Sequence, residues 1–210
     1  MAIHTTTANL GLERAGLKPM TPGDGSPEDQ MIATYGESWA SEMLALHPWR
    51  FATRDWDPRN HPDYETLFSV TDQHPDWAYE IPLTSVPSLV RILAVYDPAD
   101  QPIETYAVMV SPGYDNVQTN WALYSNQPVG RIRAVYLNDD YRTLAPLYQS
   151  ALAWRVAYEA AIIRKSAKQA TIQWLFQQYQ LTMGQAMAAD ANQTPEPDRY
   201  ARNIFSDAKG

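Results

Sequence analysis

Apolar residues change their spacing twice along this chain of 210 residues, and this pattern limits the folds that the chain can adopt. Residues 31–46 repeat apolar side chains close to every 3.6 positions, which is typical of an amphipathic helix. From Trp49 to Leu137 the repeat shortens to two, which is typical of strands, and from Leu144 the helical repeat returns. This order predicts an α+β protein in which a β segment interrupts helices.

The long helix of the first segment has clear signals at both ends. Ser26 is a good N-cap, Pro27 occupies the first helical position, and Pro48 disfavours helical geometry in the residue before it. A shorter helix is expected ahead of it, capped by one of Thr5–Thr7 and ended by Gly16. We therefore expect residues 1–47 to be helical.

Six strands are expected between Trp49 and Leu137, separated by stretches rich in the turn-forming residues Pro, Asp and Asn. The expected strands are Arg50–Trp56, Asp76–Ile81, Leu89–Tyr96, Glu104–Val110, Asn120–Tyr124 and Val129–Leu137. Strands that follow one another without helices predict an antiparallel meander, and their modest lengths predict one small sheet.

Two helical stripes follow, over Leu144–Ile163 and Ile172–Met187, with a short break near Ser166 that predicts an antiparallel hairpin. The expected fold class is α+β: a helical bundle of the long N-terminal helix plus the C-terminal helical hairpin, with an inserted small antiparallel β-sheet and an extended C-terminal tail. A single domain is expected over residues 1–190, with 1–47 helical, 48–137 as the β insertion and 144–190 as the hairpin, followed by a tail over 191–210.

Glutamines occupy the face of the second hairpin helix that its apolar stripe leaves free. They are Gln169, Gln173, Gln177, Gln178, Gln180 and Gln185. Uncharged amides at these positions are compatible with water or with a neighbouring subunit, and the sequence leaves both alternatives open.

Composition excludes several classes of protein. With no cysteine, the chain is not a disulfide scaffold, a thiol enzyme or a cysteine zinc site. Its apolar runs are too short for a membrane span, and Met1–Leu10 has neither the basic nor the apolar region of a signal peptide. A net charge of -8 argues against a protein that coats nucleic acid. We therefore expect a soluble protein that is made inside a cell.

Catalytic signatures are not found in the sequence. The four histidines lack the i, i+4 spacing of helical metal ligands, and no nucleophile elbow or glycine-rich phosphate loop is present. A metal site from His61, Asp63 and His74 is a weak alternative. We expect a protein that is not an enzyme, with no catalytic residues, no metal and no cofactor.

Charge is unevenly distributed along the chain. Residues 1–130 carry 6 basic and 17 acidic side chains, whereas residues 131–190 carry 7 basic and 4 acidic ones. Copies of the chain could therefore meet head to tail in a ring, with Arg155, Arg164, Lys165 and Lys168 as candidate subunit-interface residues. The alternative is that these four side chains only solvate helix faces.

The content of arginine and aromatic residues also favours a protein with partners. Twelve of the 16 basic residues are arginine, and the chain has 7 Trp and 13 Tyr. Buried interfaces are enriched in these three residue types. A GC-rich genome is an alternative source of the arginines.

The residues after Ala191 form a polar stretch that contains Pro195 and Pro197. Its large apolar residues are Tyr200, Ile204 and Phe205, at helical spacing. Two readings are open: an unstructured terminus, or a segment that docks into a groove of a partner.

A carbohydrate-binding module is the alternative function. Exposed aromatic rows on a sheet can stack against sugar rings, and five aromatic residues fall on or beside expected strands: Trp56, Trp77, Tyr79, Trp121 and Tyr124. Aromatic residues that alternate along strands more often face a core. The two long helices also argue against such a module.

Seven segments together resemble the head-to-tail adaptor family of tailed phages, to which the tail tubular proteins of short-tailed phages belong. The segments are Ala8–Leu12, Gly16–Pro19, Met43–Leu46, His47–Arg54, Trp77–Pro82, Val90–Leu93 and Ala145–Ala153. The resemblance extends over the chain to about Ala191, and the order of its elements is more specific than any single segment. It includes the motif Pro48-Trp49-Arg50-Phe51-Ala52, in which we interpret Trp49 and Phe51 as packing residues between the second helix and the sheet.

The resemblance implies a structural virion protein, a head-tail connector that assembles as a ring, a dodecamer, beneath the portal and leaves a channel for DNA ejection. Its partners would be the portal protein, a tail nozzle or tail-tube protein, and further copies of itself, while DNA passes through without specific binding. No catalytic residue is carried over. The C-terminal extension would reach the portal, so Tyr200, Ile204 and Phe205 become portal-binding candidates. The expected location is the neck of the virion, after synthesis in the host cytoplasm.

Overall fold

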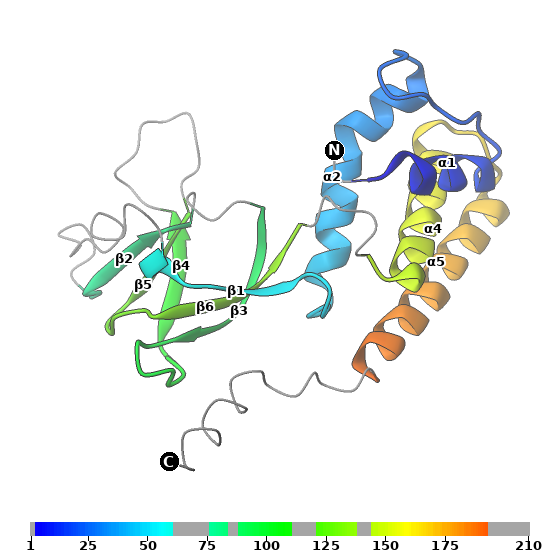
Figure 1. The fold of residues 1–210 in the computed structure, drawn as a ribbon. Helices are drawn as coiled ribbons and strands as arrows, with labels where there is room; N and C mark the ends of the chain where they lie inside the picture. Colours follow the sequence, from blue (N-terminus) through cyan, green and yellow to red (C-terminus); the bar gives the residue numbers. More distant parts are fainter. Residues whose placement is uncertain (1–2, 61–75, 84–87, 111–120, 138–143, 193–210) are drawn as a thin grey trace, which may run out of the picture.

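The computed structural model describes residues 3–60, 76–83, 88–110, 121–137 and 144–192, and these form a helical part and a β part (Figure 1). The helical part contains α1 (Thr5–Arg14), α2 (Pro27–Ala45), α4 (Pro146–Ile163) and α5 (Gln169–Ala191). The β part contains six strands and one short 3-10 turn, η1 (Pro58–Asn60), all drawn from the middle of the chain.

Helix α4 lies at the centre of the helical part, where α1, α2 and α5 all pack against it. Its buried face is rich in small residues: Ala151, Ala153, Ala157, Ala160 and Ala161. Small side chains let neighbouring backbones approach closely. The closest approach is at Gly11 of α1, where an added Cβ would lie 2.6 Å from the Cβ of Val156 and 2.7 Å from the carbonyl oxygen of Ala153.

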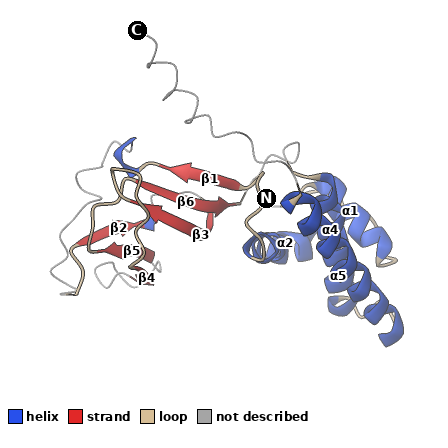
Figure 2. Ribbon diagram, turned by 90° about the horizontal axis from the view of Figure 1, so that it is seen from below, coloured by secondary structure: helices blue, strands red, loops and turns tan. Residues whose placement is uncertain are grey.

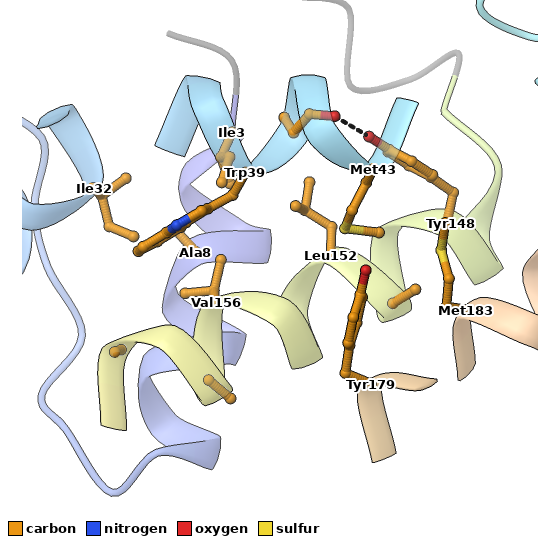
Figure 3. Packing of buried hydrophobic residues seen from close by; sticks show 14 of the residues in the cluster. Ile3, Ala8, Ile32, Trp39, Met43, Tyr148, Leu152, Val156, Tyr179 and Met183 are labelled. Atoms are coloured by element: carbon orange, nitrogen blue, oxygen red, sulfur yellow. Dashed lines mark hydrogen bonds between the residues drawn. The ribbon is translucent and has the colours of Figure 1, made fainter. Parts of the chain in front are cut away.

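Large apolar side chains from all four helices fill the space around α4 (Figure 3). Trp39 and Met43 of α2 lie over Leu152 and Val156 of α4, and all four are buried. Burying such side chains is worth roughly 1.5–3 kcal/mol each. The hydroxyl of Tyr148 donates to the carbonyl oxygen of Ala40 at 3.2 Å, and burial raises the pKa of this tyrosine.

The long helix begins where the sequence predicts. The Ser26 hydroxyl accepts a hydrogen bond from the backbone N–H of Asp29 at 3.1 Å, and Pro27 is the first helical residue. The short helix α1 differs from expectation, because the ring of His4 rather than a threonine accepts from the N–H of Thr6. Gly16 lies beyond its end with φ +72, a conformation that favours glycine.

The strands form two antiparallel sheets of three strands each (Figure 2). In the first, β6 (Arg131–Tyr136) lies between β1 (Thr53–Trp56) and β3 (Leu89–Tyr96). In the second, β5 (Trp121–Ser125) lies between β2 (Tyr79–Pro82) and β4 (Tyr106–Val110). Strands that follow one another in the sequence are therefore not hydrogen-bonded neighbours, except for β4 and β5.

This arrangement corrects the expected fold class. The prediction of one long helix and a hairpin forming a bundle with one inserted small sheet, arranged as a meander, is wrong. The described residues contain four α-helices and two three-stranded antiparallel sheets, with 48% helix and 21% strand, and form a mixed α+β fold.

The reason for the division into two sheets is a second hydrophobic core. Ile81 and Leu123 of one sheet and Val95 and Ile132 of the other are buried in the same cluster. Val135 of β6 packs with the helices, but these four side chains do not, and in a single six-stranded sheet their face would remain in water. Two sheets that share a core remove that face from water.

The β part joins the helical part through two adjacent chain segments. β1 follows α2 and pairs with β6, the last strand before α4, with Thr53 opposite Val135. The N–H of Tyr136 donates to the carbonyl oxygen of Ala52 at 2.9 Å. Arg91 of β3 donates to the carbonyl oxygen of Ala45 at 3.1 Å, which provides a partner for the end of α2. The chain therefore enters and leaves the β part at neighbouring positions.

Candidate interaction surfaces

The segment between α2 and β1 packs against the helical part through two aromatic residues, Trp49 and Phe51. Trp49 is fully buried, its Nε1–H donates to the carbonyl oxygen of Met43 at 3.1 Å, and its ring meets that of Tyr148 in an edge contact at 5.1 Å. Phe51 contacts the same tyrosine at 5.1 Å. Trp49 and Phe51 are therefore packing residues, and these contacts connect α2 to α4, a helix that the sequence interpretation did not include.

A carboxylate from the last turn of α5 also contacts the segment between α2 and β1, and we call these contacts the junction. Asp190 is buried, lies 3.0 Å from Nε2 of His47, and accepts from the backbone N–H of Arg50 at 3.3 Å. The sequence analysis missed this group, because nothing local in the sequence connects residues 47 and 190. The end of α5 is thereby fixed to the start of the β part.

Arg155, the first of the four interface candidates, has its partners within the same chain. Its Nη2 lies 2.9 Å from a carboxylate oxygen of Glu42 on α2 and 2.9 Å from one of Glu159 on α4. The guanidinium also lies over the ring of Tyr179 on α5, at 5.5 Å. This side chain thus links three helices, and its buried Nε has no hydrogen-bond partner among the described residues.

The surroundings of Arg155 shift the titration of two neighbours. Burial raises the pKa of Glu159, although the positive charge of Arg155 opposes the shift. Burial also raises the pKa of Tyr179, against the same opposing charge. Both effects follow from placing polar groups between packed helices, where water cannot solvate the charged form.

The other three candidates lie together at the turn between α4 and α5. Arg164 pairs with Glu28 of α2 at 3.4 Å. Lys165 is exposed with φ +50, and Lys168 is the exposed residue that precedes α5. Arg155 is separated from this turn by more than two turns of α4. Arg155 and Arg164 therefore balance part of the acidic charge of α2 within one molecule.

The three portal-binding candidates, Tyr200, Ile204 and Phe205, lie outside the described residues, as do His61, Asp63 and His74 of the weak metal alternative. Among the residues that are described, no group of three or more His, Cys, Asp or Glu side chains is placed to hold a metal ion. Within the same residues, none of the helices combines the length and apolar character needed to cross a bilayer.

The five aromatic residues of the sugar-binding alternative do not form one row. Tyr124 is fully buried, and Trp56 belongs to the other sheet from Tyr79, Trp121 and Tyr124. Trp121 is half exposed and Trp77 precedes β2. This distribution gives the sugar-binding alternative no support.

Arginines and carboxylates of the first sheet form an exposed network. Arg131 bridges Asp55 and Asp100, with N–O distances of 2.9 Å, and Arg133 bonds Asp55 at 2.9 Å. Arg131 also stacks over the ring of Tyr96 at 4.0 Å. Burial alone would raise the pKa of Asp55, but the hydrogen bonds and charges of Arg133 and Arg131 outweigh it and lower the pKa.

A second surface, which the sequence analysis left open, is the exposed side of α5. It exposes Trp174 and Leu181 among glutamines. Trp174 contacts Trp154 of α4 edge to face at 5.5 Å. The guanidinium of Arg14 of α1 stacks on the ring of Trp154 at 3.9 Å. Burial lowers the pKa of Arg14. The glutamine row was visible in the sequence, but the exposed aromatic and leucine were assigned to no surface.

The comparisons with known proteins add no family. No family model and no curated protein gives a significant match to this chain. Its function is therefore argued from the sequence and the geometry alone.

Proposed function

We propose that this chain is a structural virion protein that assembles as a ring, joins the portal of a tailed phage to the tail, and leaves a channel for DNA. The proposal begins with the resemblance to head-to-tail adaptors. In this role the surfaces of the molecule serve binding and assembly, and no residue is assigned a catalytic function.

The observation that supports it best is that three separated segments of the resemblance meet in one core. Ala8 and Leu12 of α1 are fully buried in the cluster that contains Trp49 and Tyr148. These residues come from the opening segment, from the Pro-Trp-x-Phe-Ala motif and from the first hairpin helix. The residues that carry the resemblance therefore include core positions that pack in one cluster.

Two separate cores also suit a bridging role. The helical cluster around α4 and the β cluster around Ile81 and Ile132 are distinct, and the parts are joined through the junction of His47, Trp49 and Asp190. Each part can therefore contact a different neighbour while the junction keeps their relation fixed. A protein placed between a portal and a tail needs two such surfaces.

Binding to portal rings tests the proposal. The full chain should co-sediment with purified portal protein of the same phage, and a variant lacking residues 191–210 should not. Circular dichroism and the melting temperature of the truncated chain provide the control for folding. Binding that is unchanged by the truncation would remove the role proposed for Tyr200, Ile204 and Phe205.

Location in the particle tests the proposal independently of the tail. Gold-labelled antibodies against the chain should bind disrupted virions at the neck, between head and tail. Label found only on the capsid shell or tail fibres would contradict the proposal. Titration of tryptophan fluorescence with a glycan array checks the sugar-binding alternative, and we expect no response.

A further inference from the structure

The outer face of α5 has an unusual composition for a helix on an acidic protein. No residue from Gln169 to Ala189 is charged. The inner side packs on α4 through Leu175, Tyr179 and Met183, whereas the outer side exposes 48% of Trp174 and 57% of Leu181. Solvated helix faces usually carry Lys and Glu, because charged side chains are the least costly residues to leave in water.

The chemistry of this face excludes two kinds of partner. The helix carries no cation between Gln169 and Ala189, and Arg14 at the edge of the face is stacked on Trp154, so the face does not fit a nucleic acid. Glutamine amides separate Trp174 from Leu181, so the face lacks the continuous apolar stripe and the flanking basic residues of a helix that lies in a membrane surface.

A second copy of the chain does fit. Two copies with a net charge of -8 repel each other. Because this face carries no charge, two copies can approach through it without placing like charges side by side. Each glutamine amide both donates and accepts hydrogen bonds, so the face can bond to neutral or acidic groups. Trp174 and Leu181 supply apolar area to bury.

The exposed side of α2 is suited to receive this face. It presents the small side chains of Ala33, Thr34 and Ser38, the half-exposed ring of Tyr35, and the carboxylates of Glu37 and Glu42, of which Glu42 accepts from the Ser38 hydroxyl at 3.2 Å. Small residues leave room for an indole ring, and amide N–H groups can bond to a carboxylate without adding negative charge. In both ribbon views α4 lies between α2 and α5, so the two helices lie on different sides of α4 (Figures 1 and 2).

We propose that the outer face of α5 docks on the exposed face of α2 of the next copy. Because two different faces meet, the contact repeats from copy to copy and closes into a ring when the rotation permits. This inference rests on the proposed ring, since a ring requires a heterologous contact, and it names the surfaces that form it.

Light scattering of the full chain over a range of concentrations is the first test. The wild-type chain should self-associate, and Leu181→Glu should weaken the association roughly tenfold or more, because the carboxylate would be buried among uncharged groups. The matched control is Val108→Glu, at a residue of β4 that is 40% exposed and lies outside both faces. It should associate as the wild type does. Equal association of the Leu181→Glu variant and the wild type would overturn the proposal.

Cross-linking tests the pairing of the two faces. The chain has no cysteine, so Ser38→Cys and Leu181→Cys can be combined without background. The double variant should form a ladder of disulfide-linked oligomers on mild oxidation, whereas either single variant should not. A dimer from Leu181→Cys alone would show that α5 meets α5, and this would overturn the proposed pairing.

The two proposals can fail separately. A wild-type chain that stays monomeric up to about 200 µM, with no cross-linked ladder, overturns the docking of α5 on α2, while label at the virion neck would still support the adaptor. Conversely, cross-linking could show the α5–α2 contact while the antibody label is missing from the neck. That result would support the contact and contradict the adaptor function.

Discussion

The carboxylate of Asp190 lies 3.0 Å from Nε2 of His47, so that the last turn of α5 is bonded to the residues that follow α2. The same carboxylate accepts from the backbone N–H of Arg50 at 3.3 Å. One buried acid thus connects the C-terminal helix to the segment that leads into β1. The relationship spans more than half of the chain and determines where α5 ends relative to the β part.

Replacing Asp190 by alanine should destabilise the protein by about 1–3 kcal/mol, because the N–H of Arg50 and the ring of His47 would lose a buried partner. Urea denaturation at neutral pH measures this change in the free energy of unfolding. Glu37→Ala, at an exposed position of α2, is the control and should change it by less than about 0.5 kcal/mol. Equal effects of the two substitutions would show that the junction contributes nothing to stability.

Two glycine substitutions should have opposite signs. Alanine is a better helix former than glycine by up to about 1 kcal/mol. Gly184→Ala on α5 should therefore stabilise, since an added Cβ meets nothing within 4 Å. Gly11→Ala should destabilise by about 1–3 kcal/mol, because its Cβ would lie 2.6 Å from that of Val156. Thermal unfolding of both variants at low protein concentration checks the pair, and stabilisation by Gly11→Ala would contradict the close packing of α1 on α4.

Asp55 should make stability depend on acid pH. Its pKa is lower in the folded protein than the ordinary value of 3.8, so the carboxylate stabilises the fold at neutral pH, and this contribution is lost as the pH falls through the lowered pKa. The difference in free energy of unfolding between the wild type and Asp55→Asn should be constant well above pH 3.8 and should shrink as the pH falls below that value and through the lowered pKa. In an Arg133→Gln background the difference should be smaller at neutral pH. A difference that does not change with pH would contradict the role of the ion network.

Arg155 and Lys165 should differ in their effect on the isolated chain. Arg155→Ala should cost about 1–3 kcal/mol, because Glu42 and Glu159 lose a charged partner. Lys165→Ala, at an exposed position, should leave the free energy of unfolding within about 0.5 kcal/mol of the wild type. Denaturant titration of the monomer at low concentration separates the two. No loss of stability in Arg155→Ala would contradict the structural role of its ion pairs within the chain.

Local signals in the sequence were sufficient for the helices. The cap at Ser26 and the proline at position 27 set the start of α2, and the β3 strand has the predicted bounds Leu89–Tyr96. These features depend on residues close in the chain, for which propensity and capping are informative. The cap of α1 was assigned to threonine, although the preceding His4 provides the acceptor.

Pairing between distant residues was not predictable in the same way. The prediction of a meander was based only on which strands follow one another in the sequence. The observed sheets instead bury Ile81, Val95 and Ile132 in one cluster. Regional charge counts likewise missed that Arg155 pairs with Glu42, which is 113 residues away in the sequence. Of the candidate surfaces, the sequence identified the glutamines of α5 but could not show that Trp174 and Leu181 are exposed beside them.

The pairing of Thr53 with Val135 has a consequence for how the molecule can be altered. Because the first and last strands of the β part are neighbours, the chain enters and leaves the β part at two adjacent points, and Arg91 and Val135 add contacts with the helical part. A short hairpin loop could replace the β part without redirecting either flanking helix. Conversely, a different β module could be grafted there, so that the end of the molecule remote from α1 can diverge in evolution while the helical core keeps its sequence.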